Sequence, residues 1–127
     1  MRKTIRIAVA TLAVVGLMAA APAALAKGGV STRGVCSGPS TWKLDLRPQN
    51  GGVLRVTLEV EGGARNQTWS VSMSDNGTAF FDGNRVSGIG GAFRATGSTA
   101  DQAGTDAVIA TAVNQVTGEA CAAAASI

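Results

Sequence analysis

Short runs of alternating apolar and polar residues, separated by turn residues, constrain the fold of this 127-residue chain more than any other feature. In the run 42–47, Trp42, Leu44 and Leu46 alternate with charged residues, and the run 54–61 repeats the pattern. A period of two puts apolar side chains on one face of a strand. The sequence Gln-Asn-Gly-Gly at 49–52 suits a tight turn. We therefore predict a β-hairpin whose first strand ends at Pro48.

The rest of the chain continues this pattern. Apolar residues alternate at 69–73, an Asn-Gly turn follows at 76–77, and a partner strand begins at 79. A further strand is expected around 93–95, closing at 96–98. The run 108–113 is apolar at nearly every position, so we predict a central strand buried on both faces. The last strand is predicted at 120–126, although its alanines also fit a helix.

Seven or eight short strands at regular spacing, without a long helical segment, predict an all-β fold. Neighbouring turns favour antiparallel pairing, and two packed sheets are the usual solution, so we expect a single antiparallel β-sandwich. A small barrel is the alternative. Trp42 and Trp69 are large enough to anchor the core between the sheets.

The first 26 residues read as a cleaved signal peptide. Arg2, Lys3 and Arg6 precede an apolar run at 7–17, and the small residues at 24–26 suit a signal peptidase. The alternative is a membrane anchor, which needs about 20 apolar residues. We predict cleavage after Ala26, which leaves one domain at 27–127 and a secreted, extracellular product.

Removal of this leader changes the charge balance. The chain has 11 basic and 8 acidic residues, and three of the basic ones lie in the leader. The mature part is left with eight of each and a net charge of zero. A neutral domain lacks the basic patch that nucleic acid or an anionic membrane surface requires. We expect neither partner, and we expect a monomer.

Two cysteines remain, Cys36 near the start of the mature chain and Cys121 near its end. Export to an oxidising compartment favours a disulfide between them. Two free thiols, or a bridge between two chains, are the alternatives. The intramolecular bond would tie the first strand to the last.

Three stretches carry a resemblance. The corner 101–106 followed by Val108, Ala110 and Ala112 resembles the turn before the penultimate strand of immunoglobulin-like domains. The stretches 36–44 and 117–121 are similar to small exported actinobacterial proteins whose role is not established. The resemblance implies an immunoglobulin-like sandwich, although the chain has no tyrosine for a tyrosine corner. Fold analogy does not give function.

The chain contains few of the residues that common catalytic sites require. The chain has no histidine, so a Ser-His-Asp triad and a His-ligated zinc site are both impossible. Four aspartates at turns or corners are better explained as backbone hydrogen-bond acceptors than as metal ligands or a glycosidase pair: Asp75, Asp82, Asp101 and Asp106. We expect no enzyme activity, no cofactor and no metal.

One glycine-rich segment suits binding. Loops on a rigid scaffold are where contacts are usually made. The segment 83–91 is expected to be a long, flexible segment of this kind, with Arg85 and Ile89 as its anchors. An irregular edge strand is the alternative. The possible binding residues are Gly83, Asn84, Arg85, Val86, Ser87, Gly88 and Ile89.

These observations favour an exported non-catalytic binding module for another exported protein or an envelope component. An inhibitor of an extracellular hydrolase is the first alternative, although its loop lacks a local disulfide or proline to stiffen it. A carrier of an apolar small molecule is the second.

Overall fold

The computed structural model describes residues 28–127, so the predicted signal peptide lies outside the described residues. The described chain forms eight β-strands and one short 3₁₀ turn, η2. Their bounds are β1 Val30–Val35, β2 Thr41–Gln49, β3 Val53–Glu61, β4 Thr68–Asp75, β5 Thr78–Val86, η2 Ile89–Gly91, β6 Phe93–Ala100, β7 Ala107–Asn114 and β8 Ala120–Ser126. The predicted all-β fold is confirmed.

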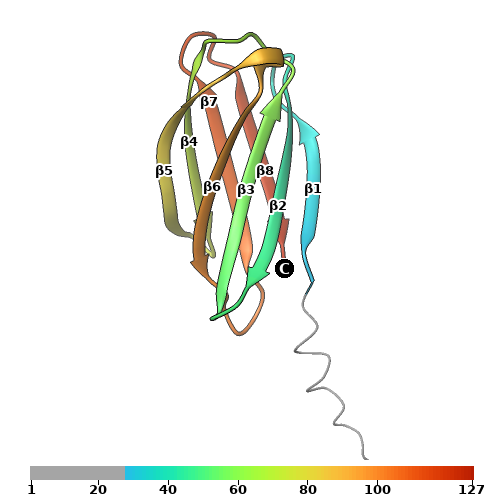
Figure 1. Ribbon diagram of the computed structural model, residues 1–127, viewed down its shortest axis with the longest axis vertical. Helices are drawn as coiled ribbons and strands as arrows, with labels where there is room; N and C mark the ends of the chain where they lie inside the picture. The colour runs from blue at the N-terminus through green and yellow to red at the C-terminus, as the bar shows by residue number, and fades with distance from the viewer. Residues whose placement is uncertain (1–27) are drawn as a thin grey trace, which may run out of the picture.

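The strands form two four-stranded antiparallel sheets that pack face to face as a β-sandwich (Figure 1). The first sheet has the order β1-β2-β3-β6, and the second has the order β5-β4-β7-β8. The chain passes from one sheet to the other after β3, β5 and β6. Within residues 28–127, no helix is long and apolar enough to cross a membrane.

The core lies between the sheets and is built from the alternating apolar residues. Trp69 is buried in this core, and its ring centroid lies 5.2 Å from that of Phe93 on the opposite sheet. Trp42 is only partly buried and packs against this core from the edge. A Cβ atom on Gly34 would come within 2.4 Å of the Trp42 ring, so glycine at that position lets the ring lie over β1.

Both predicted hairpins are confirmed. β2 pairs with β3 with Leu44 opposite Leu58, and β4 pairs with β5 across the Asn76-Gly77 turn. Both turn residues have positive φ, 49° and 85°, as a tight hairpin turn requires. β2, however, continues through Pro48 to Gln49. β1 ends its pairing at Leu46, so β2 is open on that side and the missing amide hydrogen of Pro48 is tolerated.

Two other predicted features are wrong. β6 continues beyond 98 to Ala100, paired with β3. β7 is central in its sheet but buried on one face only: Val108, Ala110 and Ala112 face the core, whereas Ile109 and Val113 are 51% and 43% exposed. A sandwich has two layers, so among residues 28–127 nothing covers the outer face of this strand.

Candidate functional site

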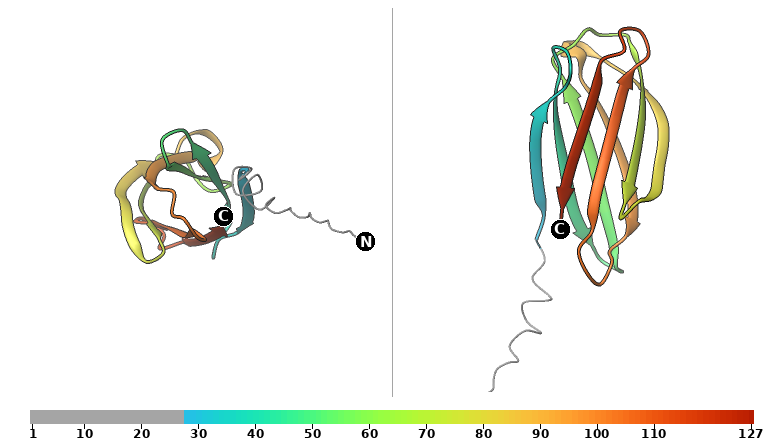
Figure 2. Two further views of the ribbon diagram at one scale, coloured as in Figure 1. Left: turned by 90° about the horizontal axis from the view of Figure 1, so that it is seen from below. Right: turned by 180° about the vertical axis from the view of Figure 1, so that it is seen from behind.

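Four loops meet at one end of the sandwich, which we call the four-loop end (Figure 1). They connect β1 to β2 (36–40), β3 to β4 (62–67), β5 to β6 (87–92) and β7 to β8 (115–119). The opposite end carries the turns 50–52, 76–77 and 101–106 together with the C-terminus (Figure 2). Loops from both sheets therefore lie together at the four-loop end.

The predicted disulfide is confirmed, and it braces this end. Cys36 directly follows β1 and is bonded to Cys121 in β8, so the bond joins the two sheets. The Ser37 amide donates a 2.9 Å hydrogen bond to the Ala120 carbonyl, and the Ala120 amide donates to the Ser37 hydroxyl. The first loop is thus fixed to the start of the last strand.

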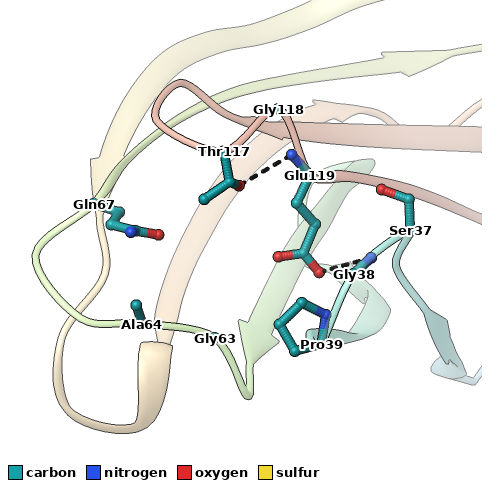
Figure 3. A pocket seen from close by; sticks show the side chains of 9 residues that line it. All are labelled: Ser37, Gly38, Pro39, Gly63, Ala64, Gln67, Thr117, Gly118 and Glu119. Carbon is teal, nitrogen blue, oxygen red and sulfur yellow. Dashed lines mark hydrogen bonds between the residues drawn. The ribbon is translucent and has the colours of Figure 1, made fainter.

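Glu119 ties the same two segments together a second time (Figure 3). One carboxylate oxygen accepts a hydrogen bond from the Gly38 amide at 3.1 Å, which Figure 3 shows. The same oxygen accepts from the Ser40 amide at 2.8 Å, and the other oxygen accepts from the Ser40 hydroxyl at 3.1 Å. Glu119 and Ser40 are both buried. A Cβ atom on Gly38 would lie 2.8 Å from the carboxylate carbon, so glycine leaves room for this contact.

Ser87 performs the same task for the other two loops. Its hydroxyl donates to the Ala64 carbonyl at 2.8 Å and accepts from the Gln67 amide at 3.0 Å. Its own amide donates to the Gln67 carbonyl at 2.9 Å. The side chain is 1% exposed. Ser87, from the predicted binding segment, therefore supports a loop and does not face solvent.

The predicted binding segment divides into two parts. Gly83, Asn84, Arg85 and Val86 belong to β5, whereas Gly88 and Ile89 lie in the loop that holds η2. Only the second part lies within the four-loop end, with Val86 at its border. The segment is a regular strand over its first four residues because each pairs with β4, from Gly83 opposite Val71 to Val86 opposite Thr68.

Arg85 lies where the edge strands β5 and β6 run beside each other, and its contacts are with strand residues rather than with loop residues. Its Nε donates to the Arg94 carbonyl of β6 at 3.2 Å, and its guanidinium carbon lies 5.1 Å from the Phe81 ring centroid. A cation over an aromatic face is favourable. Arg85 therefore closes the β5–β6 edge, and Ile89 is the predicted anchor that remains at the site.

The turn that presents Ile89 is braced by backbone contacts. The Gly88 amide donates to the Ala92 carbonyl at 2.8 Å, and the Gly62 amide donates to the Gly90 carbonyl at 2.7 Å. Gly91 has a φ of 70°, and a Cβ atom there would lie 2.4 Å from the Gly63 carbonyl oxygen. The two loops approach so closely that only glycine fits.

A pocket of about 350 Å³ opens between three of these loops (Figure 3). Sequence reasoning missed it, because its walls come from segments more than 20 residues apart. Figure 3 shows the second Glu119 carboxylate oxygen on the pocket side of the side chain, with Gln67 and Thr117 across from it. The pocket is lined by Ser37, Gly38, Pro39, Gly63, Ala64, Gln67, Thr117, Gly118 and Glu119.

Four exposed apolar side chains also lie at this end, distributed over both sheets. Val35, Val86, Ile89 and Val116 are 62–80% exposed, and each lies in one of the loops or at the strand end beside it. The other two large apolar side chains that are exposed among residues 28–127, Ile109 and Val113, lie on the outer face of β7. The opposite end presents none from the described chain.

The aspartates predicted as turn residues do not converge on a metal site. Within residues 28–127, no three His, Cys, Asp or Glu side chains are placed to hold a metal ion. Asp106 is buried, and its carboxylate accepts a hydrogen bond from the Gln102 amide within the 101–106 corner. Asp75 is buried at the end of β4.

Comparison with known proteins adds no relative. No protein family, curated protein or solved structure matches the chain.

Proposed function

We propose that this chain is an exported, non-catalytic binding module that holds its partner with the four-loop end. The observation that carries the proposal is that four of the six large apolar side chains exposed among residues 28–127 lie at this end, which also holds a pocket. Exposed apolar patches on a soluble domain mark interaction sites. An immunoglobulin-like identity is part of the proposal: the two-sheet plan supports it, although β2 neighbours β3 here whereas strand B neighbours E in antibody domains.

The bracing of the loops supports binding by a preformed surface. At this end the disulfide fixes the first loop to β8, and Glu119 and Ser87 each fix one loop to another. A loop that is already ordered loses little entropy when it binds, so more of the contact energy becomes affinity. A partner with a firm, partly apolar surface suits such a site, and another exported protein is therefore the partner that we propose.

Secretion and the lack of catalysis rest on supporting observations. The Cys36–Cys121 disulfide suits an oxidising compartment, and it leaves no thiol for nucleophilic chemistry. The sequence contains no histidine. Signal-peptide cleavage after Ala26 remains a prediction, and the mass of the exported protein tests it.

The test is affinity capture with mature protein, residues 27–127, against secreted and envelope fractions of the producing cells. We expect a near-stoichiometric partner that the Ile89→Asp variant no longer captures. Ala103→Asp is the matched control, because Ala103 is exposed in the 101–106 turn at the opposite end. Equal capture by both variants, or no captured protein, would contradict the proposal.

Hydrolase inhibition is a second candidate, and one observation favours it. Ile89 is 80% exposed on a turn held by backbone hydrogen bonds, which supplies stiffness without a local disulfide or proline. Extracellular proteases and amylases assayed with excess protein should include one that is slowed, and Ile89→Asp should relieve it. The carrier alternative has no such observation, since core side chains occupy the space between the sheets.

A further inference from the structure

The outer faces of the two sheets differ sharply in charge. The outer face of β1-β2-β3-β6 carries eight charged side chains: Arg33, Lys43, Asp45, Arg47, Arg55, Glu59, Glu61 and Arg94. The outer face of β5-β4-β7-β8 carries one, Asp82, on the edge strand β5. An outer face that only meets water is normally polar or charged. The second face, whose strands are nearest the viewer in the right-hand view of Figure 2, keeps polar hydroxyl groups on β4 and β7 but has almost no charge, and it exposes Ile109 and Val113.

This nearly uncharged face consists of small residues on both sides of a ridge, which Ile109 and Val113 form on β7. The register places Ala120, Ala122 and Ala124 of β8 beside Val113, Thr111 and Ile109 of β7. On the other side of β7 lie the serines of β4, Ser70, Ser72 and Ser74. The side chains of Ile109 and Val113 therefore project beyond the smaller side chains of the strands on both sides. A hollow of about 180 Å³ lies beside Ile109, bordered by Ser72, Ser74 and Ala79.

We propose that this face binds a second copy of the chain, sheet against sheet, in a two-fold dimer. A two-fold axis brings the same patch of both copies together, so the patch must complement itself. The face meets this requirement, because the β7 ridge of one copy can pack against the small side chains of β4 or β8 in the other copy. Side chains of packed sheets interdigitate in this way. Each face carries one charge, at its edge, so electrostatic repulsion between the two copies is small. This proposal departs from the monomer expected from the sequence.

The available area places this contact among the small interfaces. Four strands about 4.8 Å apart and seven residues long, at about 3.4 Å per residue, cover roughly 450 Å² per copy. About 900 Å² in total is at the lower end for specific interfaces, where weak or transient complexes lie. We therefore expect micromolar association. The four-loop end of each copy stays uncovered, so the inference stands independently of the proposed function.

Sedimentation velocity from about 1 µM to about 1 mM protein tests the dimer, because this range brackets a micromolar dissociation constant. The wild type should shift from monomer to dimer across the series. Thr111→Lys, at the centre of the face, should raise the dimer dissociation constant at least about tenfold by placing like charges in the contact. Ala122→Lys, its exposed neighbour on β8, should do the same and serves if Thr111→Lys does not fold.

Thr57→Lys is the matched control. Thr57 lies at the centre of the charged outer face and shares a cross-strand hydroxyl contact of 3.3 Å with Thr96, as Thr111 does at 2.8 Å with Ser72. Its dimer should match the wild type. A wild type that stays monomeric throughout would overturn the proposal. So would a dimer that the Thr111 and Ala122 variants leave intact, or that Thr57→Lys weakens equally.

Discussion

Removal of the disulfide should cost this domain a large part of its stability. Cys36 and Cys121 are 85 residues apart, so the bond closes a loop that spans most of the described chain. The loop-entropy relation gives about 4.6 kcal/mol for a loop of this length. Domains of this size have a total stability of about 5–15 kcal/mol. The Cys36→Ala/Cys121→Ala variant should therefore fold, with a strongly reduced free energy of unfolding.

Urea unfolding followed by tryptophan fluorescence, to which buried Trp69 and partly buried Trp42 both contribute, measures this loss. With a slope of about 1.5 kcal/mol per molar urea, the midpoint should fall by about 3 M. Reductant should lower the midpoint of the wild type in the same way and leave the double variant unchanged. A loss below about 2 kcal/mol with an unchanged slope would refute the reasoning, because it would mean that the loop hardly constrains the unfolded chain.

Three further predictions concern single residues. Glu119→Ala should destabilise the fold by about 2–4 kcal/mol in urea unfolding, because it leaves the Gly38 and Ser40 amides without their acceptor. Glu119→Gln keeps an acceptor oxygen and should cost under about 1 kcal/mol in the same assay. Gly91→Ala should cost at least about 2 kcal/mol by the same assay, because its Cβ meets the Gly63 backbone; a neutral result would contradict that close approach. The Ser31 hydroxyl, more than Lys43, holds the pKa of Asp45 below its ordinary value. The ionised Asp45 therefore stabilises the fold above about pH 4, and this stabilisation is lost as the pH falls through the lowered pKa. Ser31→Ala should therefore lower stability by under about 1 kcal/mol at neutral pH, with no deficit near pH 2; an equal deficit at both pH values would contradict the linkage.

Local pattern predicted the hairpins and the strand count correctly. Leu44 and Leu58 face the core from neighbouring strands because alternation and a tight turn fix the register of a hairpin. The disulfide was also predictable, since two cysteines in an exported chain have one intramolecular pairing. The hairpins depend on residues that are close in sequence, and the disulfide follows because the chain has only two cysteines.

The site was not predictable in the same way, because it depends on the order of the strands in the sheets. Nothing around Glu119 in the sequence indicates that its carboxylate binds the amides of Gly38 and Ser40, 79–81 residues earlier. The binding segment at 83–91 was recognised by its glycines, yet Gly83 lies within β5.

The run 108–113 shows a second limit of pattern. Apolar residues on both faces predicted burial on both faces, but Ile109 and Val113 are exposed in the described chain. Burial depends on a further layer, and sequence alternation says only which faces are apolar. The mismatch locates the face that we propose for the dimer.

Binding through the four-loop end is tested most directly by titration calorimetry of the captured partner against three proteins. These are the wild type, Ile89→Asp at the four-loop end and Ala103→Asp at the opposite end. Burial of one isoleucine side chain is worth about 2–3 kcal/mol, so Ile89→Asp should weaken binding by at least about 30-fold. Ala103→Asp should bind like the wild type. Equal affinities for all three proteins would contradict the proposal.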